Sequence, residues 1–543
     1  MKNGKLLEKQ KMLHFASCTL HFAFFLTILI FTSCAASSHY QKRVTDHSRS
    51  AITALFMKQH ISYLASDSMK GRATPSAELD AAAEYIARQF KSYGLQPLKG
   101  SYFQDLSYCY FDLGDNNFLS VVEGLDTKRF KLRDDFVPYD LSGSRPAEGE
   151  LVFAGYGITA PEYNYDDYKD LDVKGKHVVV LRQEPGQTDS TGKMFGGKNL
   201  TYYSGLKEKQ KMAQDHGAAG MLVISGPLQY NSVKPDGFSW PKLTKLLPKD
   251  ALPLDYCERP EEVIPMVQVG EAIIKELFVS TDSLKHIQQR IEKNMQPESF
   301  PIPGKILAMN INFISTPIGA RNVIGWLEGG DPILNKEAII IGAHYDHLGI
   351  KGVHQQGSDY IYNGADDNAS GTTGMLAVAS AFGSMAENPK RSVIFIAFAG
   401  EELGMLGSAS YVRKPLWPLG KTAAMVNLDM IGRNDPDFLK IIGARQNPAL
   451  RKIVRRQNKN TEFKLDEGKR EGMFGGSDHI SFFNKGVPVI FFFTGLHDDY
   501  HKVTDESDRI NTDKAARVAR LVFMTAWTAA NQDKHYKIVK KGD

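Results

Sequence analysis

The sequence predicts an α/β fold in which a mixed, mainly parallel sheet is flanked by helices. Short apolar runs of strand length recur in the second half of the chain, and each run stops at a glycine-rich or small-residue turn. A helical pattern follows most of these turns. Recurring strand, turn and helix is typical of sheets that bind ligands beyond the carboxyl ends of their strands.

The first elements along the chain are helical. Residues 52–97 contain two helical patterns, in which Pro75 suits a first helical turn and Gly94 suits a helix stop. Strands and helices then alternate between residues 149 and 278, and none of the polar motifs described next occurs there. This stretch is therefore expected to form a separate α/β domain.

The strands of the second half are expected to end at polar side chains. The apolar strand before His344 delivers that histidine at its end, and alternation places Asp346 on the same side. Ser370 opens an amphipathic helix after a glycine turn. The remaining polar groups are Asp366 and Asp367 at that turn, Glu401 and Glu402 after the strand Ser392–Ala399, Asp429 after the next strand, and His497, Tyr500 and His501 in the last loop.

These residue types suit a pair of transition metal ions. Two neutral imidazoles with three carboxylates and no thiolate favour zinc, with cobalt or manganese as substitutes. Two divalent ions are balanced by three carboxylates and one bridging hydroxide. Glu401 is therefore left free as the general base that takes a proton from water. The predicted ligands are His344, Asp366, Glu402, Asp429 and His501.

Six stretches, in this order, closely resemble metallopeptidase family twenty-eight, the di-zinc leucyl aminopeptidase-like exopeptidases. They are HYDHLG, NGADDNASG, AGEELGMLGS, NLDMIGR, GGSDHISF and DYHKVTDESD. The resemblance covers residues 305–530 and an earlier segment in which Asp67, Gly71 and Arg72 fit a structural signature. It implies the zinc-dependent exopeptidase fold, two zinc ions and peptide substrates.

The resemblance also implies a role for each residue. His344 and Glu402 hold different metals, Asp429 completes the first site and His501 the second. Asp366 bridges both, and a cis peptide joins it to Asp367. Glu401 is the base, and Asp346 orients His344. The implied activity is that of a zinc-dependent aminopeptidase acting through a metal-bridging hydroxide.

The chain departs from the family at one position. Some members carry a tyrosine three residues before the SDH motif to stabilise the oxyanion, whereas this chain has Phe474 there. Tyr500, directly before His501, is the candidate substitute donor. His347, His479, His497 and Asp505 are expected to make supporting contacts rather than to bind metal, with Asp505 orienting His501.

Other activities of the same scaffold stay open. A carboxypeptidase or a dipeptidase would use the same metal cluster, and the cluster does not say which end of a peptide it receives. A glutaminyl cyclase-like acyltransferase and a non-catalytic receptor-like protein are further alternatives. The complete ligand set with Glu401 favours hydrolysis over both.

Residues 125–300 resemble a protease-associated domain. Such an insert is expected either to gate the entry of substrates or only to stabilise the fold. The expected peptidase domain then comprises residues 34–124 and 301–535, and a basic tail covers 536–543. Cys109 and Cys257 either form a disulfide or remain two buried thiols.

The first residues predict a bacterial lipoprotein signal over 1–33. Lysines at positions 2, 5, 9 and 11 precede the apolar run 22–31, which ends just before Thr32, Ser33 and Cys34. This run is short for a membrane span, which favours cleavage and lipid attachment at Cys34. The protein is expected in the cell envelope, lipid-anchored and facing the periplasm.

Length and charge exclude several classes. The chain of 543 residues is 42% hydrophobic and carries a net charge of +4, which is too weak to indicate nucleic-acid binding. No other segment is long and apolar enough to span a bilayer, so contact with the membrane is expected through the lipid alone.

Overall fold

The computed structural model divides the chain into two compact units. The first comprises residues up to Leu106 and from Gly319 onward, and the second comprises Ser107–Ile318. The signal segment, Cys34 and Phe474 lie outside the described part. The residues described are 40, 42–187, 195–230, 233–236, 239–240, 252–352, 359–468 and 476–539.

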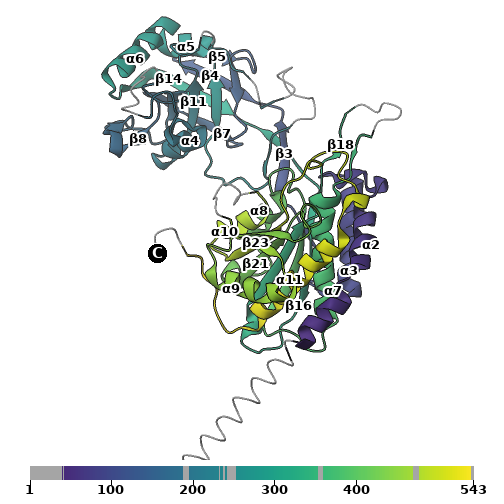
Figure 1. Ribbon diagram of the computed structural model, residues 1–543. Coiled ribbons are helices and arrows are strands. Elements are labelled where there is room, and N and C mark those ends of the chain that lie inside the picture. Colours follow the sequence, from purple (N-terminus) through teal and green to yellow (C-terminus); the bar gives the residue numbers. More distant parts are fainter. Residues whose placement is uncertain are drawn as a thin grey trace, which may run out of the picture. The chain divides into compact units, whose positions relative to one another are not determined.

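The first unit is built on a mixed nine-stranded sheet (Figure 1). The strand order is β1-β16-β20-β17-β21-β24-β22-β23, and β2 pairs with β16. Its strands are β1 (Gln96–Pro97), β2 (Phe103–Asp105), β16 (Arg321–Leu327), β17 (Ala338–His344), β20 (Ser392–Phe398), β21 (Thr422–Leu428), β22 (Phe438–Ile442), β23 (Lys464–Asp466) and β24 (Val489–Phe493), with the separate pair β18 (Gly349–Ile350) and β19 (Ile361–Tyr362).

The centre of this sheet is parallel, as expected. β20, β17, β21 and β24 are neighbours that run in one direction, whereas β16 and β22 pair antiparallel at either side. The carboxyl ends of the four parallel strands therefore lie along one edge. This edge carries His344, the loop with Glu401 and Glu402, Asp429 and the loop with His501.

Helices cover both faces of the sheet. On one face Tyr411 of α8 and Phe482 of α10 pack in a single apolar cluster with strand residues such as Ile340. On the other face Phe90 of α3 and Phe382 of α7 contact Phe395 of β20. The helices are α2 (Ala54–Leu64), α3 (Ala77–Ser92), α7 (Gly371–Gly383), α8 (Leu406–Arg413), α9 (Pro448–Gln457), α10 (His479–Phe483) and α11 (Thr512–Asn531).

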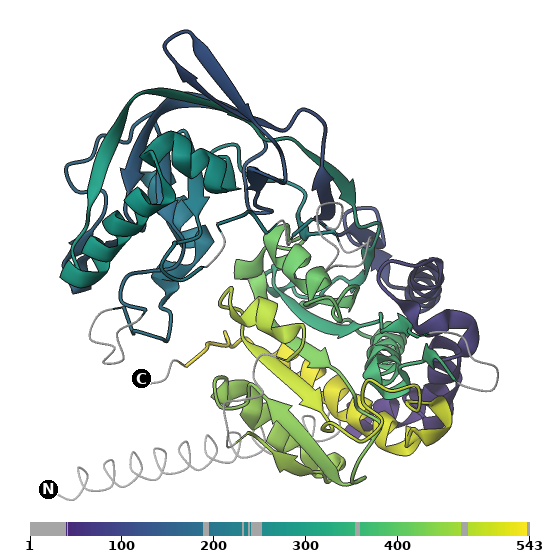
Figure 2. The same ribbon diagram turned by 90° about the horizontal axis from the view of Figure 1, so that it is seen from above.

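Helices from opposite ends of the chain meet on this second face. Figures 1 and 2 show α2, near the beginning of the described chain, beside α11 at its end. A helical segment at 42–51 also packs on α11, where His47 contacts Phe523. Helices near the beginning and the end of the described residues therefore pack together in one layer.

Two helix predictions need correction. Pro75 does not lie in a first helical turn: Ser76 is the N-cap of α3 and its side chain accepts from Leu79 N, so Pro75 precedes the cap. α7 is not amphipathic, because nearly every residue from Gly371 to Phe382 is buried between the sheet and other helices. The helix stop at Gly94, with φ +79°, is confirmed.

The second unit contains an eight-stranded sheet in the order β5-β4-β14-β7-β10-β11-β13-β6. Apolar clusters cover both of its faces, with α4 on one side and α5 and α6 on the other. Its elements are β3 (Tyr108–Leu113), β4 (Phe118–Glu123), β5 (Asp126–Phe130), β6 (Phe136–Pro138), β7 (Pro146–Ala154), β8 (Thr159–Ala160), β9 (Tyr165–Asp166), β10 (His177–Leu181), α4 (Leu206–Asp215), β11 (Gly220–Ile224), β12 (Leu254–Tyr256), β13 (Met266–Val269), α5 (Glu271–Phe278), α6 (Thr281–Asn294), β14 (Ser299–Asn310) and β15 (Phe313–Pro317).

This unit is longer at both ends than the expected insert of residues 125–300. β4 lies before that range but pairs with β14, which runs past its other end. β3 likewise pairs with β12 and β15. Cys109 of β3 and Cys257, directly after β12, form a disulfide with a Cα–Cα distance of 4.8 Å. Strand pairing therefore assigns the flanking residues to the insert.

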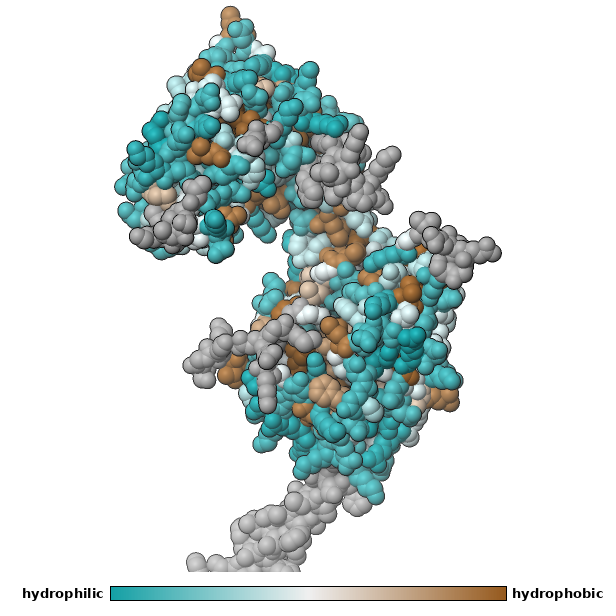
Figure 3. Space-filling model, turned by 45° about the horizontal axis from the view of Figure 1, so that its top comes forward, coloured by the Kyte–Doolittle hydropathy of each residue, from teal (hydrophilic) through white to brown (hydrophobic). Residues whose placement is uncertain are grey.

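No helix within the described ranges combines the length and the apolar character needed to cross a bilayer. Figure 3 shows a described surface that is mostly hydrophilic on the side in view, with apolar residues in small scattered groups.

His60 of α2 gives the first unit a pH-dependent stability. Burial lowers the pKa of His60 from 6.5 to about 4, while its Nδ1 lies 2.7 Å from Tyr85 Oη and its ring stacks on Phe56. Since the folded-state pKa is below the unfolded one, the unfolded chain binds the extra proton between these values. Stability should therefore fall by about 2 kcal/mol as the pH drops from about 6.5 to about 4.

Urea unfolding of the wild type and of His60→Gln at pH 7 and pH 4.5 checks this. The loss of stability on acidification should be smaller in His60→Gln, and unchanged in His286→Asn, which alters an exposed histidine of α6. Equal losses in the wild type and His60→Gln would rule His60 out as the source.

Candidate metal centre

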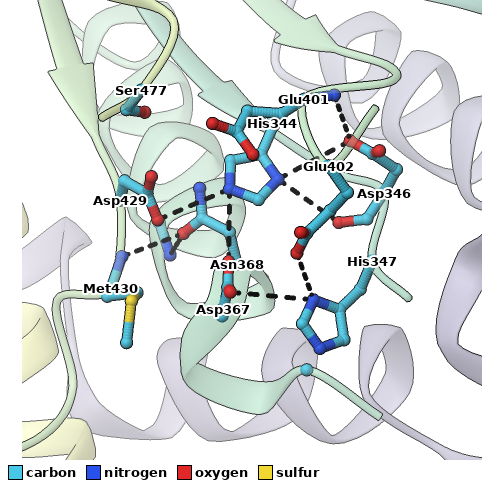
Figure 4. Close-up of polar contacts among 12 residues, drawn as sticks. His344, Asp346, His347, Asp367, Asn368, Glu401, Glu402, Asp429, Met430 and Ser477 are labelled. Carbon is cyan, nitrogen blue, oxygen red and sulfur yellow. Dashed lines mark hydrogen bonds and ion pairs between the residues drawn. The ribbon is translucent and has the colours of Figure 1, made fainter. Parts of the chain in front are cut away.

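His344 and Asp429 form one side of a buried cluster of imidazoles and carboxylates (Figure 4). His344 is the last residue of β17, and Asp429 directly follows β21, its parallel neighbour. His344 Nε2 lies 3.4 Å from Asp429 Oδ1 and 3.3 Å from Asp367 Oδ1. These three side chains offer atoms close enough together to hold one metal ion.

Asp367, and not Asp366, occupies the bridging place. Asp367 Oδ2 lies 3.2 Å from His501 Nε2, while its Oδ1 faces His344. Asp366 turns away, because its Oδ1 accepts from Gly432 N at 2.7 Å and its Oδ2 lies 3.4 Å from His497 Nε2. The order expected from the sequence, with Asp366 as the bridge and Asp367 as its neighbour, is therefore reversed in the structure.

The local backbone explains the difference. Gly364 has φ +59°, and a Cβ there would lie 2.2 Å from Asp367 O, so the turn requires glycine. The cis peptide bond joins Asp367 to Asn368, one residue later than expected. Asn368 fixes the turn to the end of β21, since it donates to Leu428 O and accepts from Met430 N.

Glu402 forms the other side of the cluster with two histidines. Its Oε1 lies 2.7 Å from His347 Nδ1, and its Oε2 lies 3.2 Å from His501 Nε2. Both histidines also face Asp367 Oδ2, at 3.8 Å for His347 and 3.2 Å for His501. Asp367 thus stands between His344 on one side and Glu402 with His501 on the other.

His347 is a member of this cluster that the sequence reasoning left outside. It is buried, and with Asp367 and Glu402 it forms a second group able to hold a metal ion. The available signal was its position in HYDHLG, three residues after His344 and beyond the same strand. The expected supporting role of His347 is also present, because its Nδ1 lies 2.7 Å from Glu402 Oε1.

Asp346 connects His344 to the loop of Glu401. Its Oδ1 lies 3.6 Å from His344 Nδ1 and accepts from Glu401 N at 3.1 Å. Its Oδ2 accepts from Thr74 Oγ1, which in turn accepts from Gly400 N. Asp346 is therefore placed to orient His344, as expected, and Thr74 is a supporting residue with no sequence motif of its own.

The electrostatics of the cluster fit bound cations. Burial lowers the pKa of His344, but Asp429 and Glu401 outweigh it and raise that pKa well above its usual value. Hydrogen bonds that His501 donates to the Asp367 and Glu402 carboxylates raise the pKa of His501 to about 10. His344 Nε2 and Asp429 Oδ1 are buried without a hydrogen-bond partner among the described residues. Buried carboxylates in excess, facing unpartnered imidazole nitrogen, are the donor set that a transition metal ion needs.

Glu401 is partly buried beside this cluster. Burial raises its pKa to about 10, and the negative charges of Asp478 and Asp429 act in the same direction against the opposing effect of His344. Asp478 itself is fully buried, which raises its pKa to about 7. In the cluster without cations this shift keeps Glu401 protonated at neutral pH, so Glu401 can act as a general base only when positive charge held by the neighbouring side chains lowers its pKa.

The remaining candidate residues, in the last loop and in α10, make contacts of their own. Tyr500 stacks on His501 with a centroid distance of 3.8 Å. Asp505 does not orient His501: its carboxylate accepts from Asp366 N and Asp367 N and so holds the bridging turn. His497 contacts Asp366, and His479 is buried against Phe491.

Arg72 joins three segments beneath the cluster. It is 1% exposed and donates to the backbone carbonyls of Leu64, Tyr345, Asn363 and Gly364. The Leu64 carbonyl lies at the end of α2, whereas the other three belong to the segments that precede Asp346 and Asp366, so Arg72 fixes two of the loops that carry the cluster. The structural role expected for Arg72 from the sequence signature with Asp67 and Gly71 is thus present.

Arg72→Lys should therefore lower the free energy of unfolding by about 3 kcal/mol, because a lysine ammonium cannot reach this spread of acceptors and leaves buried carbonyls unpaired. Urea unfolding measures the loss. Arg88→Lys, at an exposed position of α3, is the matched control and should lose less than about 0.5 kcal/mol. If the two variants were equally stable, the hydrogen bonds of Arg72 to these backbone carbonyls would not stabilise the fold.

Two family models match the chain. The model described as "Peptidase family M28" matches residues 322–526, and the model described as "PA domain" matches residues 147–277. The first range contains every residue of the cluster described above. The second lies inside the unit Ser107–Ile318.

Individual relatives are more distant. Aminopeptidase YwaD of Bacillus subtilis (strain 168) is 24% identical over 416 residues, which cover 74% of this chain and 72% of YwaD. A glutamate carboxypeptidase 2 homolog of Caenorhabditis briggsae is 29% identical over 461 residues, or 71% of this chain and 55% of that protein. Among solved structures, an aminopeptidase from Aneurinibacillus sp. strain AM-1 aligns with a TM-score of 0.44 and 20% identity over 93% of this chain and 98% of its own.

Proposed function

We propose that this chain, which matches the model of peptidase family M28 over residues 322–526 and that of the PA domain over residues 147–277, is a zinc-dependent aminopeptidase that removes N-terminal residues from peptides. The supporting observation is the arrangement around Asp367. This carboxylate lies between His344 with Asp429 on one side and Glu402 with His501 on the other, at the carboxyl ends of parallel strands.

In this proposal His344 and Asp429 hold one zinc ion, Glu402 and His501 hold the other, and Asp367 contacts both. His501 is preferred to His347 as a ligand because it lies closer to Asp367 Oδ2, at 3.2 Å against 3.8 Å. His347 then donates to Glu402 Oε1 and orients that carboxylate. Two divalent ions held here would polarise a scissile carbonyl and bring the pKa of water down to about 7.

The protein side chains move the proton. Glu401 accepts a proton from the attacking water and passes it to the amine that leaves. Asp346 holds the backbone of Glu401 and faces His344, so base and ligand keep a fixed relation. Tyr500, beside His501, is the proposed donor to the oxyanion.

The amino-terminal polarity is supported by the similarity to an aminopeptidase over 74% of this chain. A carboxypeptidase is the second candidate, because the chain is also similar to a glutamate carboxypeptidase 2 homolog, although it spans only 55% of that protein. A panel of matched peptides separates the two. Each peptide would be offered with both ends free, with an acetylated amino end, or with an amidated carboxyl end.

We expect cleavage of free and amidated peptides and none of acetylated peptides. Cleavage confined to peptides with a free carboxyl end would establish a carboxypeptidase instead. Conversion of N-terminal glutamine to pyroglutamate without hydrolysis would indicate an acyltransferase. Zinc content, measured on the same preparation by atomic emission, should approach two ions per chain.

We also propose that the mature chain is anchored in a bacterial envelope through lipid on Cys34 and faces the periplasm. The support is in the sequence, where a lysine-rich start and a short apolar run precede that cysteine. Mass spectrometry of the N-terminal peptide tests the proposal. Cys34→Ala should abolish both the lipid mass and partition into detergent, and an unmodified Cys34 in the membrane fraction would contradict it.

A further inference from the structure

A hollow with three arginine side chains lies in the first unit and shares no residue with the metal centre. Its volume is about 310 Å³, near the lower end of the roughly 300–1,000 Å³ typical of ligand pockets. It is formed where the helical segment 42–51 meets α11 and the turn after α9. The principal lining residues are Ser48, Arg49, Thr461, Glu462, Arg517 and Arg520. We call these residues the arginine hollow.

Positive charge is concentrated in the arginine hollow. Three guanidinium groups and one carboxylate line it, a difference of two positive charges. No ion pair within 4.0 Å joins Arg49 or Arg520 to a carboxylate of the described residues, and Asp513 acts on Arg520 only from a greater distance. The arginines also oppose one another, since Arg49 and Arg517 add to the effect of burial in lowering the pKa of Arg520.

Arg517 is held in place at the edge. Its guanidinium lies over the ring of Phe463 at 4.1 Å and pairs with Asp437 at 2.8 Å. Its Nε is buried and has no hydrogen-bond partner among the described residues. One donor of this ordered side chain is therefore left over beside the arginine hollow.

The hydroxyl groups of Ser48 and Thr461 in the arginine hollow are already used within the protein, since Ser48 Oγ donates to Thr45 O at 2.9 Å and Thr461 Oγ1 donates to Asn458 Oδ1 at 3.0 Å. The donors of the hollow are therefore its guanidinium groups. Three of them around one hollow suit an anion with oxygens on several sides better than a planar carboxylate, which one arginine binds in two-point fashion. We propose that the arginine hollow binds a phosphate group.

Two sources would present this chemistry. One is free inorganic phosphate, and the other is the headgroup of an anionic phospholipid. Arg49 lies in the helical segment 42–51, whose first residue follows Cys34 by eight residues. A fully extended chain of that length reaches at most about 29 Å, so an anchor at Cys34 would keep the headgroup layer within range. The experiment therefore has one arm for each source.

Isothermal titration of the full chain with inorganic phosphate and, separately, with glycerophosphoglycerol tests the proposal. Binding should weaken about tenfold in Arg49→Gln and in Arg520→Gln. Arg456→Gln removes the same charge from an exposed position of α9 outside the arginine hollow and should bind as the wild type does. Thermal midpoints and peptidase rates of all three variants establish that they are folded.

The pattern across variants decides the outcome. If phosphate affinity falls only in Arg49→Gln and Arg520→Gln, the ligand of the arginine hollow is the free ion. If the affinity for glycerophosphoglycerol falls only in these two variants, the ligand is the lipid headgroup. Phosphate also suits a zinc centre, so binding that persists equally in all variants belongs elsewhere and overturns the proposal. Absence of binding in both arms, or equal weakening by Arg456→Gln, overturns it too.

Discussion

Glu401→Gln should reduce kcat by about 10²- to 10⁴-fold while the zinc content stays at the wild-type level. The amide keeps the shape of the side chain but cannot accept the proton of water. Asp346 accepts from the backbone N of Glu401, so this contact fixes the loop and does not occupy the Glu401 carboxylate. Rates on an aminoacyl anilide, measured together with zinc content, check both halves of the expectation.

Two controls give this result its meaning. Glu328→Gln makes the same change at an exposed position after β16 and should leave the rate unchanged. Glu402→Ala should lose zinc as well as activity, because Glu402 faces both His501 and His347. If Glu401→Gln kept the full rate, another group would be the base. If it lost zinc, Glu401 would be a ligand.

The fold and the edge of the sheet that carries the site were predictable from the sequence. Fully apolar runs such as the one that ends at His344 are long enough for buried parallel strands, and glycine turns mark their ends. Parallel neighbours place their carboxyl ends together, which predicts that His344, Asp429 and the Glu401 loop lie at one edge of the sheet.

Finer positions were not predictable, because they depend on contacts from distant segments. The choice between Asp366 and Asp367 is made by Gly432 N and by Asp505, more than 60 residues away along the chain. His347 joins the cluster because Glu402 reaches it from another strand end. The insert likewise begins earlier than its sequence pattern suggests, since β4 is recruited by β14. The side chains of adjacent loop residues point in different directions. Which of them faces the site is fixed by contacts with residues that are distant in the sequence.

The position of Asp367 between His344 and His501 makes it the residue whose replacement tests the metal centre most directly. Asp367→Asn should lower zinc affinity more than about 100-fold and abolish peptidase activity, because it removes the charge that lies within 3.3 Å of His344 and 3.2 Å of His501. In the proposed arrangement both metal sites lose an anionic ligand in this variant, so zinc content should fall below one ion per chain.

Asp366→Asn is the matched variant, one residue away with the same chemistry. Its amide oxygen still accepts from Gly432 N, and its amide nitrogen faces His497, so the turn is kept. It should retain zinc and most of its activity. Zinc analysis of both proteins after dialysis against a weak chelator separates the assignments: retention in Asp367→Asn with loss in Asp366→Asn would restore Asp366 as the bridge, and with it the order that the sequence alone suggested.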